Sequence, residues 1–202
     1  MIRGQLSRRE LSRGSTRADY DSVMDVRIET EAKWRADERE HERLRTELRR
    51  AEASHVDTVR EINTLFDSVD GALRQSGRLL RLRRLDHGLS ILTLKGPATY
   101  HDGVKIREET ELQLNDHDAM IAILNGLGLS ASIEYRKTRE SWRFAGAVVA
   151  LDLLEFGEFV EIEGAESELR RAADRLGLDM DGAERRGYPS MMRAHLAAER
   201  AN

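Results

Sequence analysis

Two short stretches near opposite ends of the chain alternate charged and apolar residues. The charged residues are 29, 31 and 33 in residues 29–33 (ETEAK), and 161 and 163 in residues 159–163 (FVEIE). A β-strand would place these charges on one face and the residues between them on the other. Such alternation is also typical of a strand with one solvated face. If both strands instead face inward, their carboxylates suit a hard divalent cation such as Mg²⁺ or Mn²⁺. The acids concerned are Glu29, Glu31, Glu161 and Glu163.

Composition narrows the class of protein. The chain has 202 residues, of which 35% are charged and 40% hydrophobic, which suits one domain with a substantial core. The 33 basic and 37 acidic residues nearly balance, which argues against general nucleic-acid binding. The absence of cysteine excludes thiolate metal sites and disulfides. No apolar run is long enough to cross a bilayer or to form a secretory signal, so we expect no membrane contact and a cytoplasmic location.

The amino-terminal segment differs from the rest of the chain. Residues 1–23 are rich in Arg and Ser and lack apolar periodicity, so we predict a disordered arm. Translation from Met24 and a transit peptide remain alternatives for this segment. Residues 24–202 are then a single domain.

The periodicity of the remaining chain predicts about eight strands, joined by connections short enough to be antiparallel. Helices are expected after the first strand, after the fifth and at the end, and they would cover the outside of the sheet. Under such a cover the charged faces would point inward, giving an α+β protein with a closed antiparallel barrel, or tunnel. The predicted strands are 25–34, 62–67, 79–84, 89–97, 105–114, 131–139, 142–152 and 158–163, and the main helices are 37–53, 116–124, 165–176 and 188–199.

The predicted interior carries both signs of charge. Buried charges are costly unless they are paired or hold an ionic ligand, and a chain of phosphates with its metal ions would satisfy both signs. Arg and Lys bind phosphate oxygens, while carboxylates hold Mg²⁺ or Mn²⁺. The expected lining residues are Glu29, Glu31, Lys33, Arg81, Arg83, Lys95, Arg107, Glu109, Glu111, Lys137, Arg139, Asp152, Glu161 and Glu163.

These motifs together resemble a known family. Residues 29–33 match the ExExK signature of the CYTH family, or triphosphate tunnel metalloenzymes, which includes class IV adenylyl cyclases, thiamine triphosphatases and inorganic triphosphatases. The resemblance spans about residues 25 to 195 and is greatest to the class IV adenylyl cyclase branch. It independently implies an eight-stranded antiparallel tunnel. The other matching motifs are 80–83 (LRLR), 92–97 (LTLKGP), 107–111 (REETE), 137–139 (KTR), 151–152 (LD) and 159–163 (FVEIE).

The resemblance also implies roles for single residues. Asp152 would be a further metal ligand or would orient water, and Lys33 would order the neighbouring carboxylates and touch a phosphate. Glu109 and Glu111 either bind a second metal or pair with the arginines. The implied metal ligands are Glu29, Glu31, Glu161 and Glu163, and the implied triphosphate cradle is Arg81, Arg83, Lys95, Arg107, Lys137 and Arg139.

Three functions fit this pattern. The first is metal-dependent hydrolysis of tripolyphosphate, thiamine triphosphate or another organic triphosphate. The second is conversion of ATP to cyclic AMP and pyrophosphate, which needs the same cradle. The third is triphosphate binding without catalysis, which the acids argue against because a pure anion binder gains little from them. A homodimer is left open.

Overall fold

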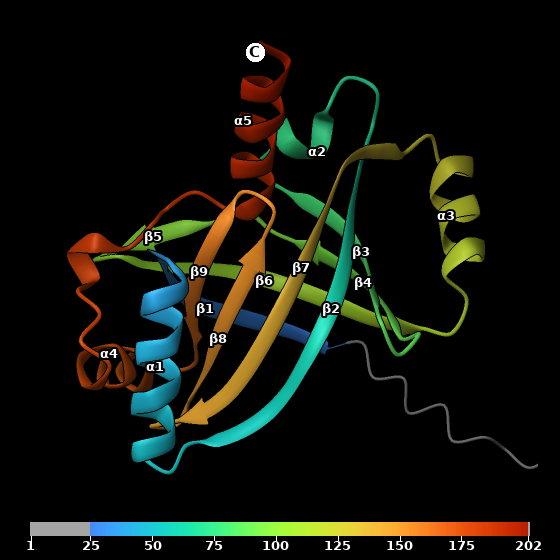
Figure 1. The fold of residues 1–202 in the computed structure, drawn as a ribbon. Coiled ribbons are helices and arrows are strands. Elements are labelled where there is room, and N and C mark those ends of the chain that lie inside the picture. Colours follow the sequence, from blue (N-terminus) through green and yellow to red (C-terminus); the bar gives the residue numbers. More distant parts are fainter. Residues whose placement is uncertain (1–24, 202) are drawn as a thin grey trace, which may run out of the picture.

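The computed structural model describes residues 25–201, so the predicted arm lies outside the described residues. Figure 1 shows the strands curving around into a barrel, with helices on its outer side and the carboxy-terminal helix at one end. The strands are β1 (Asp25–Ala36), β2 (Ser54–Asp67), β3 (Leu79–Leu85), β4 (Ser90–Lys95), β5 (Thr99–His101), β6 (Val104–Leu114), β7 (Ser130–Phe144), β8 (Ala147–Leu154) and β9 (Gly157–Glu163). The helices are α1 (Glu38–Arg50), α2 (Ala72–Gln75), α3 (His117–Gly126), α4 (Glu166–Arg175) and α5 (Tyr188–Ala201), with a 3-10 turn at Met180–Gly182.

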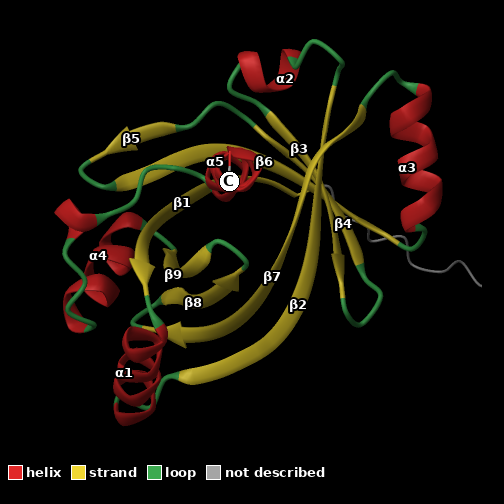
Figure 2. Cartoon of the chain, turned by 45° about the horizontal axis from the view of Figure 1, so that its top comes forward, coloured by secondary structure: helices red, strands yellow, loops and turns green. Residues whose placement is uncertain are grey.

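Pairing of the first and sixth strands closes the barrel. The strands follow the order β1-β9-β8-β7-β2-β3-β4-β6, and β1 pairs with β6 to complete the ring. All of these pairings are antiparallel, and β5 adds a short edge beside β6. Figure 2 shows the ring of strands. The predicted eight-stranded antiparallel barrel is confirmed.

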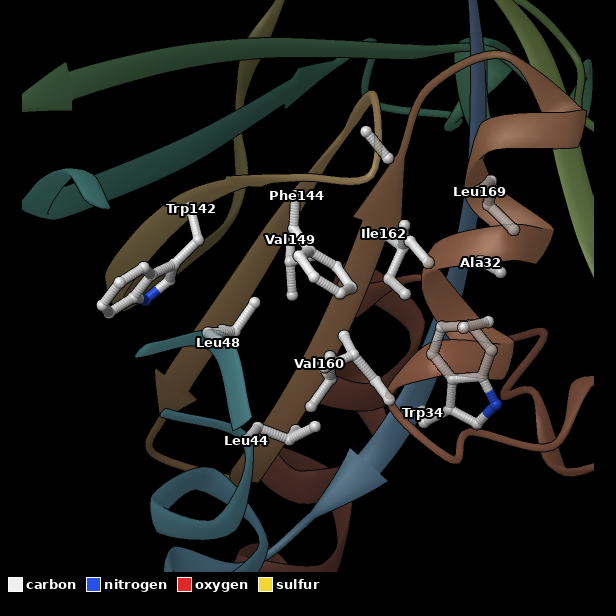
Figure 3. Close-up of a cluster of buried hydrophobic side chains, with 14 of the residues drawn as sticks. Ala32, Trp34, Leu44, Leu48, Trp142, Phe144, Val149, Val160, Ile162 and Leu169 are labelled. Atoms are coloured by element: carbon white, nitrogen blue, oxygen red, sulfur yellow. The ribbon is translucent and has the colours of Figure 1, made fainter. Parts of the chain in front are cut away.

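One side of the barrel carries the largest apolar cluster. The alternate residues of β1 that do not face the interior, Ala32 and Trp34, pack with Val160 and Ile162 of β9. Helices α1 and α4 cover them through Leu44 and Leu169, which are fully buried (Figure 3). Burying these side chains stabilises the fold by about 1.5–3 kcal/mol each relative to leaving them exposed.

Helix α1 is more deeply packed than its charge predicts. The sequence suggests an exposed helix with little apolar surface, but Leu44 and Leu48 are fully buried on one stripe. Two leucines four residues apart occupy one face of a helix. They are enough to anchor the helix when a sheet lies beneath them. Asp37 begins the helix by accepting a hydrogen bond from the Glu40 backbone nitrogen at 2.8 Å.

Two other helices occupy different parts of the barrel. Helix α3 covers the outer side of β2, β3 and β4, where Leu124 packs with Phe66 and Leu82. Helix α5 instead packs its Met191 against Leu65, which is paired across the strands with Arg81 and therefore shares the inner face. Helix α5 thus covers one end of the barrel. None of the helices described between residues 25 and 201 is long and apolar enough to cross a membrane.

Several predicted strand boundaries are wrong. Strand β2 starts at Ser54, eight residues before its apolar run, because the polar segment pairs along β7. The predicted break after Arg139 is absent: β7 continues to Phe144, and the chain turns at Ala145 and Gly146, which both have positive φ. The short β5 was missed. Its three residues are all exposed, so they carry no apolar alternation.

Candidate functional site

The barrel encloses a cavity of about 270 Å³ with a charged lining. Basic groups outnumber acidic ones two to one, so the cavity suits an anion that carries several charges. The basic residues are Arg27, Lys33, Arg81, Arg83, Lys95, Lys105, Arg107, Lys137, Arg139 and Arg193, and the acids are Glu29, Glu31, Glu109, Glu161 and Glu163. Of the fourteen residues expected inside, twelve are in this lining. Glu111 and Asp152 are not, but they bind lining residues.

Strands β1 and β9 form the acidic side of the cavity. Glu31 lies directly opposite Glu163, and Lys33 lies directly opposite Glu161. The Lys33 Nζ is 2.7 Å from the Glu161 carboxylate, and Lys105 Nζ is 2.5 Å from Glu31. Burial alone would raise the pKa of Glu161, but Lys33 and Arg139 outweigh it and hold that pKa well below its usual range.

Glu163 is the least neutralised acid of this side. The nearest described cation is Arg27, whose Nη1 is 3.9 Å from the Glu163 carboxylate. Burial and the charge of Glu29 raise the pKa of Glu163 above its ordinary value. Glu163 is thus less well compensated than Glu31 and Glu161, each of which has a basic group within 2.7 Å.

Lys95 is shared by two acids of neighbouring strands. Its Nζ lies 3.2 Å from each carboxylate oxygen of Glu29 and also contacts Glu109. Glu109 is only 1% exposed, and burial together with the adjacent Glu29 raises its pKa to about 7. One lysine thus serves two carboxylates, and Glu109 gains a proton near neutrality.

Strand β3 supplies two arginines to the opposite side. Arg83 lies 3.6 Å from both Glu61 and Glu111, and Arg81 lies 3.7 Å from Glu111. The Nε atoms of both arginines are buried and have no hydrogen-bond partner among the described residues. Because an unsatisfied buried donor costs about 1–3 kcal/mol, an acceptor bound in the cavity would be stabilised by them.

Asp152 of β8 is fully buried, and it lies behind Arg139 and Lys137 of the cavity lining. Arg139 donates two hydrogen bonds to its carboxylate, at 2.7 and 2.6 Å. The Tyr188 hydroxyl donates a third at 2.8 Å, and Lys137 Nζ lies 3.5 Å away. In this arrangement Asp152 fixes the guanidinium of Arg139, so it acts on the cavity through that side chain.

Several residues of the site were missed from the sequence. Arg27 and Lys105 each lie two residues from a predicted lining residue, and continuing the period of two would have found them. Glu61 is buried between Arg83 and Lys137, but the predicted strand began one residue later. Tyr188 comes from a helix, and its ring lies 3.9 Å below Lys33 Nζ. No periodic signal points to it.

The carboxylates of the cavity are paired with basic side chains, so they are not arranged around a common point as metal ligands would be. Among residues 25–201, no three His, Asp or Glu side chains already lie at the spacing of a metal site. The implied ligands Glu29, Glu31, Glu161 and Glu163 nevertheless line one cavity. Their carboxylate oxygens are the donors that Mg²⁺ and Mn²⁺ prefer.

The closed antiparallel barrel with its charged lining defines the class of protein. Residues 27–188 match the CYTH domain family. This match covers most of the chain, so the protein belongs to the CYTH family. The resemblance drawn from the sequence motifs is confirmed.

Relatives of known name or structure are similar to large parts of the chain. A Methanocaldococcus jannaschii protein named as a candidate adenylate cyclase is 32% identical over 106 residues, which is 52% of this chain and 59% of that relative. The match therefore spans less than two thirds of that relative's length.

Two solved structures share the fold. A candidate adenylate cyclase from Vibrio parahaemolyticus has a TM-score of 0.70 at 21% identity, covering 82% of this chain and 98% of its own. A Hippeastrum protein, described as a candidate adenylyl cyclase with dominant triphosphatase activity, has a TM-score of 0.66 at 21% identity. The match covers 83% of this chain and 95% of the Hippeastrum chain.

Proposed function

We propose that this protein is a divalent-metal-dependent enzyme that hydrolyses an inorganic or organic triphosphate inside the tunnel. The observation that carries the proposal is the excess of basic over acidic groups around the cavity of the barrel. A triphosphate has several negative charges along a short chain, and arginines bind such oxygens with directed, charge-assisted hydrogen bonds.

The chain's own basic residues would hold the phosphates. Arg81 and Arg83 line the cavity, and their buried Nε donors have no partner among the described residues, so their guanidinium groups have hydrogen-bonding capacity that the protein does not use. Arg139 is kept in place by Asp152, and Arg107 is held by two hydrogen bonds to the Gly96 carbonyl, at 3.2 and 2.7 Å. Groups fixed in this way stabilise developing charge without reorganising, which is what phosphoryl transfer chiefly requires.

The acidic side fits a divalent cation by its chemistry. Glu29, Glu31, Glu161 and Glu163 offer hard oxygen donors in one cavity, and Glu163 has only Arg27 as a described cation within 4.0 Å. A bound Mg²⁺ or Mn²⁺ would neutralise phosphate oxygens and lower the pKa of its water. Lys33 and Lys105 now neutralise Glu161 and Glu31, and we expect them to move toward phosphate oxygens when a cation binds. A direct metal contact of Asp152 remains a prediction, as does its role in orienting water.

Conversion of ATP to cyclic AMP is the alternative, favoured by the names of the relatives and by the motif resemblance. A cyclase must also fix the nucleoside, so that the ribose oxygen reaches the α-phosphorus. No Asn or Gln is among the described residues that line the cavity. Of its three lining tyrosines, Tyr135 and Tyr188 are packed, whereas Tyr100 is 43% exposed. Hydrolysis requires the lining residues to bind only the phosphates and not a nucleoside, so we rank it first.

Product analysis tests the proposal. The protein is supplied with tripolyphosphate, thiamine triphosphate or ATP, with Mg²⁺ or Mn²⁺ in turn, and a chelator serves as the control. We expect metal-dependent release of phosphate from at least one of these compounds. Formation of cyclic AMP and pyrophosphate, with tripolyphosphate untouched, would favour the cyclase. Binding without turnover of any of them would favour a non-catalytic role.

A further inference from the structure

Tyr188 reaches the charged cavity from a helix. It is the first residue of α5, which lies at one end of the barrel (Figure 1). Tyr188 lines the cavity and is only 6% exposed, whereas the other buried residues described in this lining belong to strands. Helix α5 thus supplies one buried side chain to a site that is otherwise built on the barrel wall.

The Tyr188 hydroxyl completes the hydrogen bonding of Asp152. It donates to Asp152 Oδ2 at 2.8 Å, and Arg139 donates to both carboxylate oxygens, at 2.7 and 2.6 Å. Asp152 is fully buried, so bulk water does not reach these bonds. The carboxylate is therefore held from two directions, by β7 through Arg139 and by α5 through Tyr188, and this limits the orientations that the guanidinium of Arg139 can take.

The ring of Tyr188 lies close to two ammonium groups. Lys33 Nζ is 3.9 Å from the ring centroid and Lys137 Nζ is 5.5 Å from it, and both distances are within the range of cation–π attraction. Lys33 also pairs with Glu161 at 2.7 Å. Its ammonium is thus held by a carboxylate and an aromatic ring together, so the ring remains as a partner if the ion pair opens.

Neighbouring aromatic side chains fix the ring itself. Its centroid lies 5.2 Å from that of Phe159 in an edge-to-face arrangement, 6.1 Å from Phe156 and 6.3 Å from Tyr135. These separations are typical of packed aromatic pairs. Phe159 is fully buried, so the ring of Tyr188 cannot move without disturbing the apolar packing around it. Tyr188 is therefore a rigid support for the charged groups that it contacts.

We propose that Tyr188 is a positioning residue for phosphoryl transfer: its hydroxyl orients Arg139 through Asp152, and its ring keeps the ammonium of Lys33 in the cavity. The inference rests on the proposed function, in which these basic groups bind phosphate oxygens. Long basic side chains lose much rotamer freedom when they are ordered, so a support that orders them beforehand lowers that cost. The benefit is greatest in the transition state, where groups that need no reorganisation stabilise developing charge.

Steady-state phosphate release, from whichever triphosphate the wild type hydrolyses, tests the proposal. Tyr188→Phe keeps the ring and removes one buried hydrogen bond, so kcat should fall about 10-fold. KM should stay within about 3-fold of wild type, because the loss is felt mainly in the transition state. Tyr188→Leu removes the ring as well and should lower kcat about 10-fold further. Tyr188→Met takes its place if the leucine variant does not fold.

Phe156→Leu is the matched control for packing. Phe156 is a neighbour of the Tyr188 ring but is not among the described residues that line the cavity. Its replacement should lower the melting temperature and leave kcat unchanged. A loss of kcat in this control as large as in Tyr188→Phe would mean that packing alone explains the effect, and it would overturn the inference.

A second measurement follows Arg139 directly and does not depend on turnover. Nitrogen-15 relaxation of its Nε–H group, with a chelator present, should report an ordered side chain in the wild type and in Phe156→Leu, and a more mobile one in Tyr188→Phe. Wild-type kcat or unchanged Arg139 order in folded Tyr188→Phe overturns the role of the hydroxyl. Equal kcat for Tyr188→Phe and Tyr188→Leu overturns the role of the ring. These results leave the proposed function standing, whereas a wild type that hydrolyses no triphosphate overturns that function and leaves the relaxation test of Arg139 valid.

Discussion

The two faces of the barrel wall are equally buried but differ in chemistry. On β1, Ala32 and Trp34 are 2% and 5% exposed and pack beneath helices, whereas Glu31 and Lys33 are 7% and 5% exposed and face the cavity. The outer face stabilises the fold by removing apolar surface from water. The charged side chains of the inner face lose their hydration on folding, and their ion pairs offset only part of that free-energy cost. Burial alone therefore does not distinguish core from site in this protein.

The difference predicts how each face responds to change. A substitution on the outer face should lower stability and leave the chemistry of the cavity intact. A conservative substitution on the inner face should remove function while leaving the apolar core intact, because it changes the charge of the cavity and not the packing beneath the helices.

Loss of an inner carboxylate has the largest expected effect. Glu31→Gln and Glu163→Gln should each lower triphosphate turnover by roughly 1,000-fold, equivalent to about 4 kcal/mol of transition-state stabilisation, because each removes an implied metal ligand. Steady-state phosphate release measures this effect, and thermal unfolding should show that the variants remain folded. Glu134→Gln, on the outer face of β7, should keep wild-type turnover. Activity within a few-fold of wild type in both inner variants would contradict the site assignment.

Leu44→Ala tests the outer face. Leu44 is fully buried on the face of α1 that packs against the sheet, so its truncation should lower the free energy of unfolding by about 2–5 kcal/mol. Urea denaturation measures this change, and turnover per folded molecule at low temperature should be unchanged. Leu127→Ala is the control, because Leu127 is 71% exposed and should cost little. A folded Leu44→Ala variant with a damaged active site would show that the two faces are coupled.

Glu109 gives the inner face a dependence on pH. Burial and Glu29 raise its pKa from an ordinary 4.5 to about 7, so the folded protein favours the protonated acid. This contribution to stability is fully present below about pH 4.5 and is lost as the pH rises through 7. At 1.36 kcal/mol per pKa unit, the loss is up to roughly 3 kcal/mol.

Glu109→Gln should remove this contribution to the pH dependence, because glutamine stays neutral. Chemical denaturation in the presence of a chelator, at pH 5 and at pH 8, measures the difference between variant and wild type. The wild type should lose more stability than the variant between these two values. Equal losses would show that Glu109 is already ionised at pH 5 in the folded protein.

The sequence predicted the inner face better than the contacts made across it. Alternation in β1 and β9 was enough to place Glu29 and Glu161 on one wall, because the period of two fixes which face a residue occupies. Their present partners were not predictable. Lys105 is 74 residues from Glu31 and Tyr188 is 36 from Asp152, so only the closed barrel brings them together. The burial of α1 was not predicted for a similar reason, because its two leucines form part of a core only when a sheet packs against them.

Adjacent arginines of β3 give the sharpest test of the comparison, although the expected effect is the smallest. Arg83 lines the cavity, whereas Arg84 is exposed and outside it. Arg83→Ala should weaken binding of a non-hydrolysable triphosphate analogue by about 1.5–3 kcal/mol, or roughly 10- to 100-fold, because a charged hydrogen bond to phosphate is lost. Arg84→Ala has the same loss of net charge and should leave affinity within about two-fold of wild type. Titration calorimetry at fixed ionic strength distinguishes the two, and equal losses would mean that overall charge, rather than the inner face, attracts the ligand.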